Sequence, residues 1–363
     1  MFKKVFAVTL SVMMLLSMVG CTSKTSGEDK ITPSGGNDKA TVTEGADSSD
    51  GVTQAASGEL TKVSFRLNYT ASGLHSPFYM ALEKGYYEEA GLDVTIGEGT
   101  GSGTTAKLVG TGSDDLGLVD SASVGSAVAG GIPIKVVCPV YAVNGYGIIS
   151  LASTGIESPK DLEGKKVGIA TGDGPSNLFA AVAAANDVDL DKINFVSMDS
   201  NSKITALIKG QVDAILGGAD NEAITIKNMG NEVNVLRYSE YGAATVGLSV
   251  IASDNFIQNN PEVVKSFISA TMKAWNEARG DAEGTVEYIL DDFPTMDKNT
   301  ALGGLQVALD SLFAADSSTL GNLSESDWEN CRDLLVNYMG VDESVKATDL
   351  YTFDCLPEDL PAK

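Results

Sequence analysis

The chain has 363 residues, 43% of them hydrophobic, and a formal net charge of -24 at pH 7. This acidic balance argues against nucleic acid as a partner, because binding to phosphates requires clustered Lys and Arg. After the N-terminal segments, roughly 300 residues remain, which is enough for two ordinary domains or for one protein built from two lobes.

Residues 1–20 are typical of a secretory signal peptide, since two lysines near the start precede an apolar run that ends at Gly20-Cys21. The run is short for a membrane-spanning helix. Its ending resembles a lipobox, in which Cys21 would be acylated, for example with palmitate, and would become the new N-terminus. We therefore expect a lipoprotein anchored to the cell membrane on its extracytoplasmic face. Residues 21–59 are rich in Ser, Thr, Gly and Asp and are predicted to form a disordered tether.

From residue 60 onward, short apolar runs alternate with helical stretches, a pattern typical of α/β proteins. The first lobe is predicted to begin with residues 60–150. Its strands are expected at 62–69, 92–97, 115–119, 133–141 and 146–152, and its helices at 77–90, 102–110 and 121–130.

A second series of βα units predicts another lobe over residues 151–246. Its strands are expected at 166–170, 193–197, 212–216 and 233–238, and its helices at 158–162, 176–186, 202–209 and 222–229. A strand at 244–252 and a helix at 261–279 then return to the first lobe, which residues 247–363 would complete. Two crossings, near 149–154 and 241–248, would join the lobes.

The other cysteines leave two alternatives open. Cys138 lies in an apolar run and is expected to be a buried free thiol. Cys331 and Cys355 could form a disulfide, because an exported protein meets an oxidising environment, or they could remain two separate thiols.

The stretch 67–94 carries the strongest functional signal. It reads LNYTASGLHSPFYMALEKGYYEEAGLDV and leads from a strand through a turn into a helix that begins near Ser76-Pro77. Ligands of open α/β sheets bind outside the carboxyl ends of the strands, where helix N-termini point. His75, the one histidine of the sequence, therefore falls with Tyr69 and Tyr79 where a small-molecule site is expected.

This stretch resembles the THI5-like (NMT1/THI5-like) group of ABC-transporter solute-binding proteins. The shared positions are Leu67, His75, Tyr79, Ala81, Gly85, Tyr86, Tyr87, Gly91, Leu92, Asp93 and Val94. Asn68 stands where the family has an acid, and Tyr69 stands where it has a tryptophan. Three further motifs follow in the family's order, at 157–168, 207–214 and 260–267. The resemblance implies a type II periplasmic binding protein, with two α/β lobes joined by two crossings and a ligand cleft between the lobes.

Residues that follow the predicted strands are the candidates for contact with a ligand in that cleft. They are Asn68, Tyr69, His75, Tyr79, Asp120, Ser121, Tyr146, Asp173, Ser176, Asn177 and Glu222. Structural alternatives stay open for several of them. His75 could tie the turn by hydrogen bonds, Tyr79 could belong to the core, and Asp120 could cap a helix.

The loops expected at the cleft contain aromatic rings, acids, glycines and hydroxyls, but no Arg or Lys. Aromatic faces can stack on a flat ring, and carboxylates can accept hydrogen bonds from its N–H groups. A phosphate or a dicarboxylate would usually recruit Arg or Lys, although helix N-termini can hold an anion without them. We therefore favour a neutral or amine-bearing heterocycle as the ligand.

The resemblance implies a binding protein that captures a small molecule by lobe closure and delivers it to the permease subunits of an ABC importer. A thiamine-precursor pyrimidine or a riboflavin-like compound is the favoured ligand. The alternative is an anion such as a sulfonate, taurine or nitrate. A surface sensor that presents its ligand to a receptor would look the same in sequence. We expect a monomer, held to the membrane through Cys21, with no cofactor and no metal.

Some eukaryotic relatives make the thiamine pyrimidine, and the form that they resemble needs several histidines and a cysteine-rich iron-binding cluster. This chain has one histidine and lacks the ligand spacing of a metal site. We therefore predict that the chain is not an enzyme.

Overall fold

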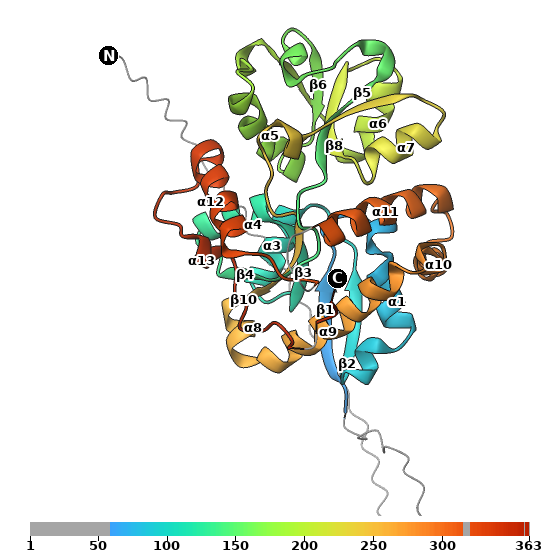
Figure 1. The fold of residues 1–363 in the computed structure, drawn as a ribbon, viewed down its shortest axis with the longest axis vertical. Coiled ribbons are helices and arrows are strands. Elements are labelled where there is room, and N and C mark those ends of the chain that lie inside the picture. Colours follow the sequence, from blue (N-terminus) through green and yellow to red (C-terminus); the bar gives the residue numbers. More distant parts are fainter. Residues whose placement is uncertain (1–58, 315–319, 359, 363) are drawn as a thin grey trace, which may run out of the picture. The chain divides into compact units, whose positions relative to one another are not determined.

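The computed structural model describes residues 59–314, 320–358 and 360–362 (Figure 1). These residues belong to one compact unit of the chain. The predicted signal peptide, the lipidation site Cys21 and the predicted tether up to residue 58 lie outside the described residues.

The first lobe is built on a five-stranded sheet with the strand order β2-β1-β3-β10-β4. β1 is parallel to β2 and β3, whereas β10 is antiparallel to β3 and β4. The strands are β1 (Thr61–Arg66), β2 (Leu92–Gly97), β3 (Leu116–Asp120), β4 (Ile134–Pro139) and β10 (Leu248–Ser253). Because β10 lies between β3 and β4, this lobe is made from two separate stretches of chain.

Helices cover this first sheet, and several of them come from the C-terminal part of the chain (Figure 1). They are α1 (Ser76–Glu83), α2 (Tyr86–Glu89), α3 (Ser102–Gly110), α4 (Ser121–Ala129), α8 (Asp254–Asn259), α9 (Pro261–Ala278), α10 (Ala282–Asp292), α11 (Lys298–Ala314), α12 (Glu325–Met339) and α13 (Ala347–Leu350).

The second lobe is built on another five-stranded sheet, with the order β7-β6-β8-β5-β9. β6 is parallel to β7 and β8, and β5 is antiparallel to β8 and β9. The strands are β5 (Tyr146–Leu151), β6 (Lys166–Ile169), β7 (Asn194–Ser197), β8 (Ala214–Gly218) and β9 (Val233–Arg237), and the helices are α5 (Gly174–Ala185), α6 (Lys203–Ile208) and α7 (Glu222–Asn228).

The position of β5 corrects the predicted division of the chain. This strand was expected in the first lobe, but it pairs with β8 and β9 in the second. The first crossing therefore lies at 140–145, before the expected 149–154, and the return crossing lies at 242–247. Apolar content predicts a buried strand at β5 but does not say which sheet will bury it: Ile148 and Ile149 pack on opposite faces of the second sheet.

The helix expected at 77–90 is interrupted. It ends at Glu83, and Gly85 has a φ of 71° before α2 begins. Glycine enters this left-handed region without the steric penalty of a side chain, and such a residue cannot continue a right-handed helix. The break turns Tyr87 into the core, where its ring stacks on Phe267 of α9 at 5.0 Å between centroids.

Helices of the C-terminal region contact both lobes. Leu334 and Met339 of α12 pack against the apolar cluster of the second lobe. α11 packs closely against α7: a Cβ atom added to Gly303 would lie only 2.9 Å from the Ile224 side chain. The two sheets are thus connected by packed helices as well as by the two crossings.

The cysteines in the described residues are all free and buried. Cys138 is the buried thiol that was expected. Cys331 and Cys355 do not form a disulfide, because they lie in different apolar clusters of the first lobe. No helix formed by residues 59–314, 320–358 or 360–362 is both long enough and apolar enough to span a membrane.

Candidate functional site

A cavity of about 310 Å³ lies between the two lobes and is lined by residues from both. The first lobe contributes the loop after β1 and the N-terminal turns of α3. The second lobe contributes the start of β5, the loop after β6, part of the segment 200–203 and the loop after β8. Most of these segments follow the carboxyl ends of strands, which is where ligands bind in open α/β sheets.

The loop after β1 is tied by His75. Ser72 N donates to Nδ1 of His75 over 3.0 Å, so the ring proton lies on Nε2, which donates to Asn68 Oδ1 over 2.9 Å. The side chain is buried, and burial lowers the pKa of His75 to about 3. The imidazole is therefore neutral at physiological pH. His75 therefore holds the turn, which was the structural alternative drawn from the sequence, and it also lines the cavity; its contact with a ligand stays a prediction.

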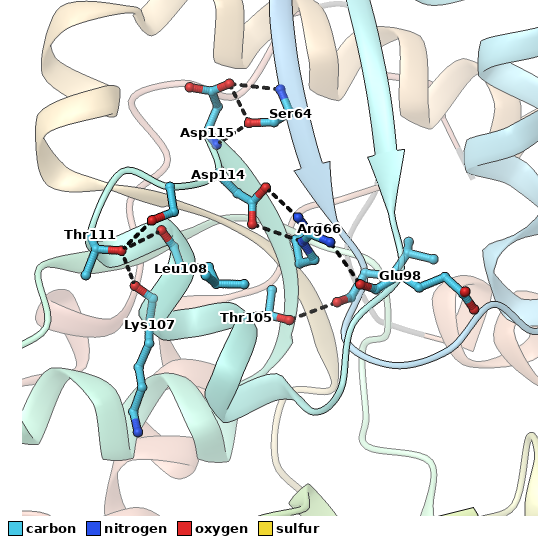
Figure 2. Close-up of polar contacts among 11 residues, drawn as sticks. Ser64, Arg66, Glu98, Thr105, Lys107, Leu108, Thr111, Asp114 and Asp115 are labelled. Atoms are coloured by element: carbon cyan, nitrogen blue, oxygen red, sulfur yellow. Dashed lines mark hydrogen bonds and ion pairs between the residues drawn. The ribbon is translucent and has the colours of Figure 1, made fainter. Parts of the chain in front are cut away.

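A second network fixes the carboxyl ends of β1 and β2 (Figure 2). Arg66 donates from Nε and Nη2 to the two carboxylate oxygens of Asp114, over 2.9 and 3.0 Å, and from Nη1 to the carbonyl of Glu98. The Asp114 hydrogen bond raises the pKa of Arg66. Thr105 Oγ1 donates to the carbonyl of Leu67 over 2.8 Å. These bonds position the first turns of α3 at the cavity.

Tyr69 joins the lobes across the cavity. Its hydroxyl donates to Asn201 Oδ1 over 3.0 Å, and the two residues are 132 positions apart in the sequence. Tyr146 enters the same space from the second lobe. Burial, followed by the negative charges of Asp120, Asp173 and Asp220, raises the pKa of Tyr146 far above its ordinary value, so its phenol stays protonated.

The wall of the second lobe holds a buried ion cluster around Lys203. This side chain is 1% exposed, and its Nζ lies 3.0 Å from Asp173 Oδ2 and 2.9 Å from Glu222 Oε1. It also donates to the carbonyl of Leu216 over 2.8 Å. Burial lowers the pKa of Lys203, but Glu222 and Asp173 together outweigh it and raise the pKa. One cation is thus held by two carboxylates.

Asp220, in the loop after β8, is a third acid of this wall. Tyr141 donates to its Oδ2 over 2.9 Å. Burial raises the pKa of Asp220 to about 6 in spite of this hydrogen bond. The second lobe therefore presents a negative surface to the cavity.

The sequence candidates separate into two groups. Those that line the cavity are Asn68, Tyr69, His75, Tyr146, Asp173 and Glu222. Those that do not are Tyr79, Asp120, Ser121, Ser176 and Asn177.

Each residue of the second group has a structural contact. Tyr79 packs edge-on against Phe293 at 5.7 Å between ring centroids. Asp120 caps α4, since its carboxylate accepts from Ser123 N and Ser123 Oγ. Ser121 donates to the carbonyl of Val246. The backbone N–H groups of Ser176 and Asn177 bond to the Asp173 side chain and carbonyl, respectively, at the start of α5.

The expectation that the cleft contains no Arg or Lys is wrong. Lys203 and Lys107 both line the cavity. They belong to helices α6 and α3, whereas the predicted cleft consisted of the loops that follow strands. Lys203 follows one short 3-10 turn, residues 200–202, after β7, and a lysine at the start of a helix gives no distinctive signal in the sequence. Figure 2 shows the Lys107 side chain extending from α3 away from the Arg66 network.

Within the described residues, no group of three or more His, Cys, Asp or Glu side chains is arranged to hold a metal ion.

Comparisons with a family model and with known proteins place this chain in the same family. A family model described as NMT1/THI5 like matches residues 73–284. The 4-amino-5-hydroxymethyl-2-methylpyrimidine phosphate synthase THI13 of Saccharomyces cerevisiae is 25% identical over 283 residues, which cover 74% of this chain and 80% of the yeast protein. The riboflavin-binding protein RibY of Chloroflexus aurantiacus is 25% identical over 244 residues, which cover 65% of this chain and 67% of RibY.

Solved structures show the same architecture. The periplasmic aliphatic sulphonate binding protein SsuA of Escherichia coli has a TM-score of 0.64 and 16% identity, covering 85% of this chain and 95% of SsuA. The periplasmic nitrate-binding protein NrtA of Synechocystis PCC 6803 has a TM-score of 0.54 and 16% identity, covering 67% of this chain and 69% of NrtA. These likenesses confirm the predicted fold class of two α/β lobes.

The relatives correct one prediction. The chain was expected not to be an enzyme, but relatives from Saccharomyces cerevisiae and Schizosaccharomyces pombe are named as pyrimidine phosphate synthases. The prediction relied on the number of histidines and cysteines. That number does not decide whether a chain is an enzyme in a family whose members share one fold and differ in activity.

Proposed function

This chain belongs to the NMT1/THI5-like family, and from that premise we propose that it is an extracytoplasmic solute-binding protein of an ABC importer. It captures a small heterocycle, either a thiamine-precursor pyrimidine or a riboflavin-like compound, by closure of the two lobes. It then delivers the ligand to the permease subunits. The protein acts as a monomer.

The cavity between the lobes is the observation that supports this proposal most strongly. Its walls come from both sheets, and Tyr69 and Asn201 meet across it. A ligand in this position contacts both lobes only when they are closed, so its binding free energy favours closure by a hinge motion at the crossings.

The chemistry of the walls favours a ring with N–H donors. Tyr69 and Tyr146 offer aromatic faces for stacking. Asp220 and the carboxylates around Lys203 can accept hydrogen bonds from ring or exocyclic N–H groups. The charge of Lys203 is already matched by two carboxylates, so it gives little support to a bound anion.

An anionic ligand, such as a sulfonate or nitrate, is the alternative, and Lys107 is the observation that favours it. This side chain lines the cavity, and its Nζ has no ion-pair partner in the described part of the chain. It is exposed, however, and the acids of the second lobe face it across the cavity. We therefore rank this alternative second.

Calorimetric titration of the purified chain decides between the two ligand classes. The compounds are 4-amino-5-hydroxymethyl-2-methylpyrimidine, riboflavin and an aliphatic sulfonate. The proposal expects saturable binding of one of the two heterocycles and no measurable binding of the sulfonate. Saturable sulfonate binding without heterocycle binding would reverse the ranking.

The lipid anchor is also part of the proposal. The signal sequence and the Gly20-Cys21 ending support acylation of Cys21, which would hold the binding unit at the membrane surface. Metabolic labelling with palmitate should mark the wild-type protein, and Cys21→Ala should abolish both the label and the membrane association. Retained labelling in Cys21→Ala would place the lipid elsewhere.

Synthesis of a pyrimidine phosphate is a second candidate function, because the yeast relatives carry that name. Mass spectrometry of the purified chain after incubation in a cell extract should show whether 4-amino-5-hydroxymethyl-2-methylpyrimidine phosphate accumulates above the level of a control extract. Accumulation would favour this candidate over transport.

A further inference from the structure

A second cavity, of about 270 Å³, adjoins the first at the loop after β1. The two cavities have wall residues in common: Tyr69, Ser72, Ser200, Asp220, Asn221 and Glu222. The hydrogen bond between Tyr69 and Asn201 spans the cleft where the cavities meet. Beyond it, the second cavity reaches towards α7 and α11, where Thr225 and Thr300 line it. A ligand can therefore extend from one cavity into the other.

The walls of the second cavity combine polar uncharged groups with a small apolar patch. Hydroxyls and amides come from Thr70, Ser72, Ser200, Asn201, Asn221, Thr225 and Thr300. The apolar patch consists of Ala71, Ile204, Met296 and Ala301. This mixture suits a chain whose carbon atoms pack on the apolar patch while its hydroxyl groups exchange hydrogen bonds with the opposite wall.

Several polar groups of this wall have unused hydrogen-bonding capacity among the described residues. Asn201 accepts from Tyr69 through Oδ1, while its side-chain nitrogen donates to no described group. The amide nitrogen of Asn221 and the hydroxyl of Ser200 have no described partner either. Donors and acceptors enclosed by a ligand need partners, because an unmet polar group costs free energy on burial.

The charges of this wall are all negative. Asp220 and Glu222 belong to it, and no Lys, Arg or His is among the described residues that line it. An arm ending in a phosphate would bring further negative charge beside these carboxylates, and the neighbouring cation Lys203 is already paired with Glu222 and Asp173. The second cavity therefore selects against an anionic arm.

We propose that the second cavity is a subsite for a neutral, hydroxyl-bearing side arm of the ligand, whose ring occupies the first cavity. This inference rests on the proposed function, since it takes a flat heterocycle as the occupant of the first cavity. It narrows the ligand class to a ring compound with a polyol-like substituent.

Three flavin probes test the subsite with the full chain. Riboflavin carries a neutral hydroxylated arm, lumiflavin has the same ring with a methyl group in place of the arm, and flavin mononucleotide has an arm that ends in phosphate. Calorimetric titration should show that riboflavin binds at least about tenfold more tightly than either of the other two, because only its arm matches the wall. Equal or tighter binding of lumiflavin would overturn the subsite, and equal binding of flavin mononucleotide would overturn its preference for a neutral arm.

A pair of tryptophan variants tests whether the arm of riboflavin binds in the second cavity. Thr225→Trp fills the second cavity from α7, and Thr205→Trp places the same ring on the exposed face of the neighbouring helix α6. Thr225→Trp should reduce riboflavin affinity to that of lumiflavin and leave lumiflavin affinity unchanged, whereas Thr205→Trp should change neither. Thr225→Leu, a smaller change, gives the same comparison if the tryptophan variant does not fold. Unchanged riboflavin affinity in a folded Thr225 variant would contradict the proposal.

The outcomes separate this inference from the proposed function. Tight binding of 4-amino-5-hydroxymethyl-2-methylpyrimidine, which lacks such an arm, with no flavin binding would overturn the subsite and leave the transport proposal standing. Binding of a sulfonate in place of every heterocycle would overturn both the subsite and the proposed ligand class.

Discussion

The hydroxyl of Tyr141 donates a hydrogen bond to Asp220 Oδ2 over 2.9 Å. Tyr141 lies in the first crossing between the lobes, and Asp220 lies in the loop after β8. The bond therefore links the hinge region to an acid of the cavity wall. Burial nevertheless raises the pKa of Asp220 from 3.8 to about 6.

Asp220 should make ligand binding depend on pH. An ionised carboxylate accepts hydrogen bonds from N–H groups better than a protonated one, so affinity for the tightest-binding heterocycle should rise between about pH 5 and pH 7. His75 does not titrate in this window, because its pKa is about 3. Calorimetry across this range should show the rise in the wild type and a flat profile in Asp220→Asn. A rise of the same size in Asp220→Asn would assign the effect to another group.

The ionisation of Asp220 should lower the stability of the fold, although it raises the affinity for the ligand. The folded state binds the Asp220 proton more tightly than the unfolded state, so this residue contributes stability that is present below about pH 4 and is lost as the pH rises through about 6. The difference between the two pKa values corresponds to at most roughly 3 kcal/mol. Urea unfolding should therefore give Asp220→Asn a larger free energy of unfolding than the wild type at pH 7. A smaller value there would show that the ionised carboxylate is stabilising.

Lys203→Met should destabilise the second lobe strongly. Removing the ammonium leaves Asp173 and Glu222 facing each other in a buried site, and breaking a buried ion cluster costs about 3–5 kcal/mol. Lys209→Met, on the exposed side at the end of the same helix, is the matched control and should change the free energy of unfolding little. Adding Asp173→Asn and Glu222→Gln to Lys203→Met should recover part of the loss. A small change in the free energy of unfolding for Lys203→Met alone would contradict a stabilising role of the ion cluster.

Asn68→Asp should raise the pKa of His75. The substitution places a carboxylate at the acceptor of the Nε2 proton, and a nearby negative charge favours the imidazolium. Because His75 is the one histidine in the sequence, its ring signals in an NMR titration need no assignment. The wild-type ring should stay neutral down to about pH 3. Protonation of the wild-type ring near pH 6.5 would show that the ring is exposed to water.

Gly304→Ala should weaken ligand binding by hindering closure. A Cβ atom at Gly304 of α11 would lie 2.7 Å from the carbonyl oxygen of Asp220, so the loop after β8 would have to move away. Alanine also favours a helix over glycine by about 1 kcal/mol, so α11 itself should not suffer. Gly280→Ala, whose Cβ would meet its nearest neighbour at 3.5 Å, is the matched control. Small-angle scattering should show a larger radius of gyration for Gly304→Ala only, and an unchanged radius with unchanged affinity would contradict the packing argument.

Local sequence patterns predicted most of the elements but could not place them all. The helix at Ser102–Gly110 was predicted with the bounds that the structure has. The strand Tyr146–Leu151 was predicted as an element and placed in the wrong lobe, because hydrophobicity reports burial and not the partner that provides it.

In the candidate site too, the sequence predicted residues next to strand ends but not residues that only the packing of the fold brings together. The loop residues Asn68 and Tyr69 could be found from the strand-to-helix junction. Lys203 could not, because only the packing of α6 beneath the loops after β6 and β8 brings its ammonium to Asp173 and Glu222. Asp120 was chosen for its position at a strand end, and there it serves as a helix cap.

The most direct test of a ring compound held between the lobes is the dissociation constant of the tightest-binding pyrimidine or flavin for Tyr69→Ala. Loss of the aromatic face and of the bond to Asn201 should weaken binding by tenfold or more, since stacking and one hydrogen bond together contribute about 1–3 kcal/mol. Tyr338→Ala, which removes an exposed ring from α12, should bind as the wild type does. A folded Tyr69→Ala protein with undiminished affinity would show that the ligand does not bind in this cavity.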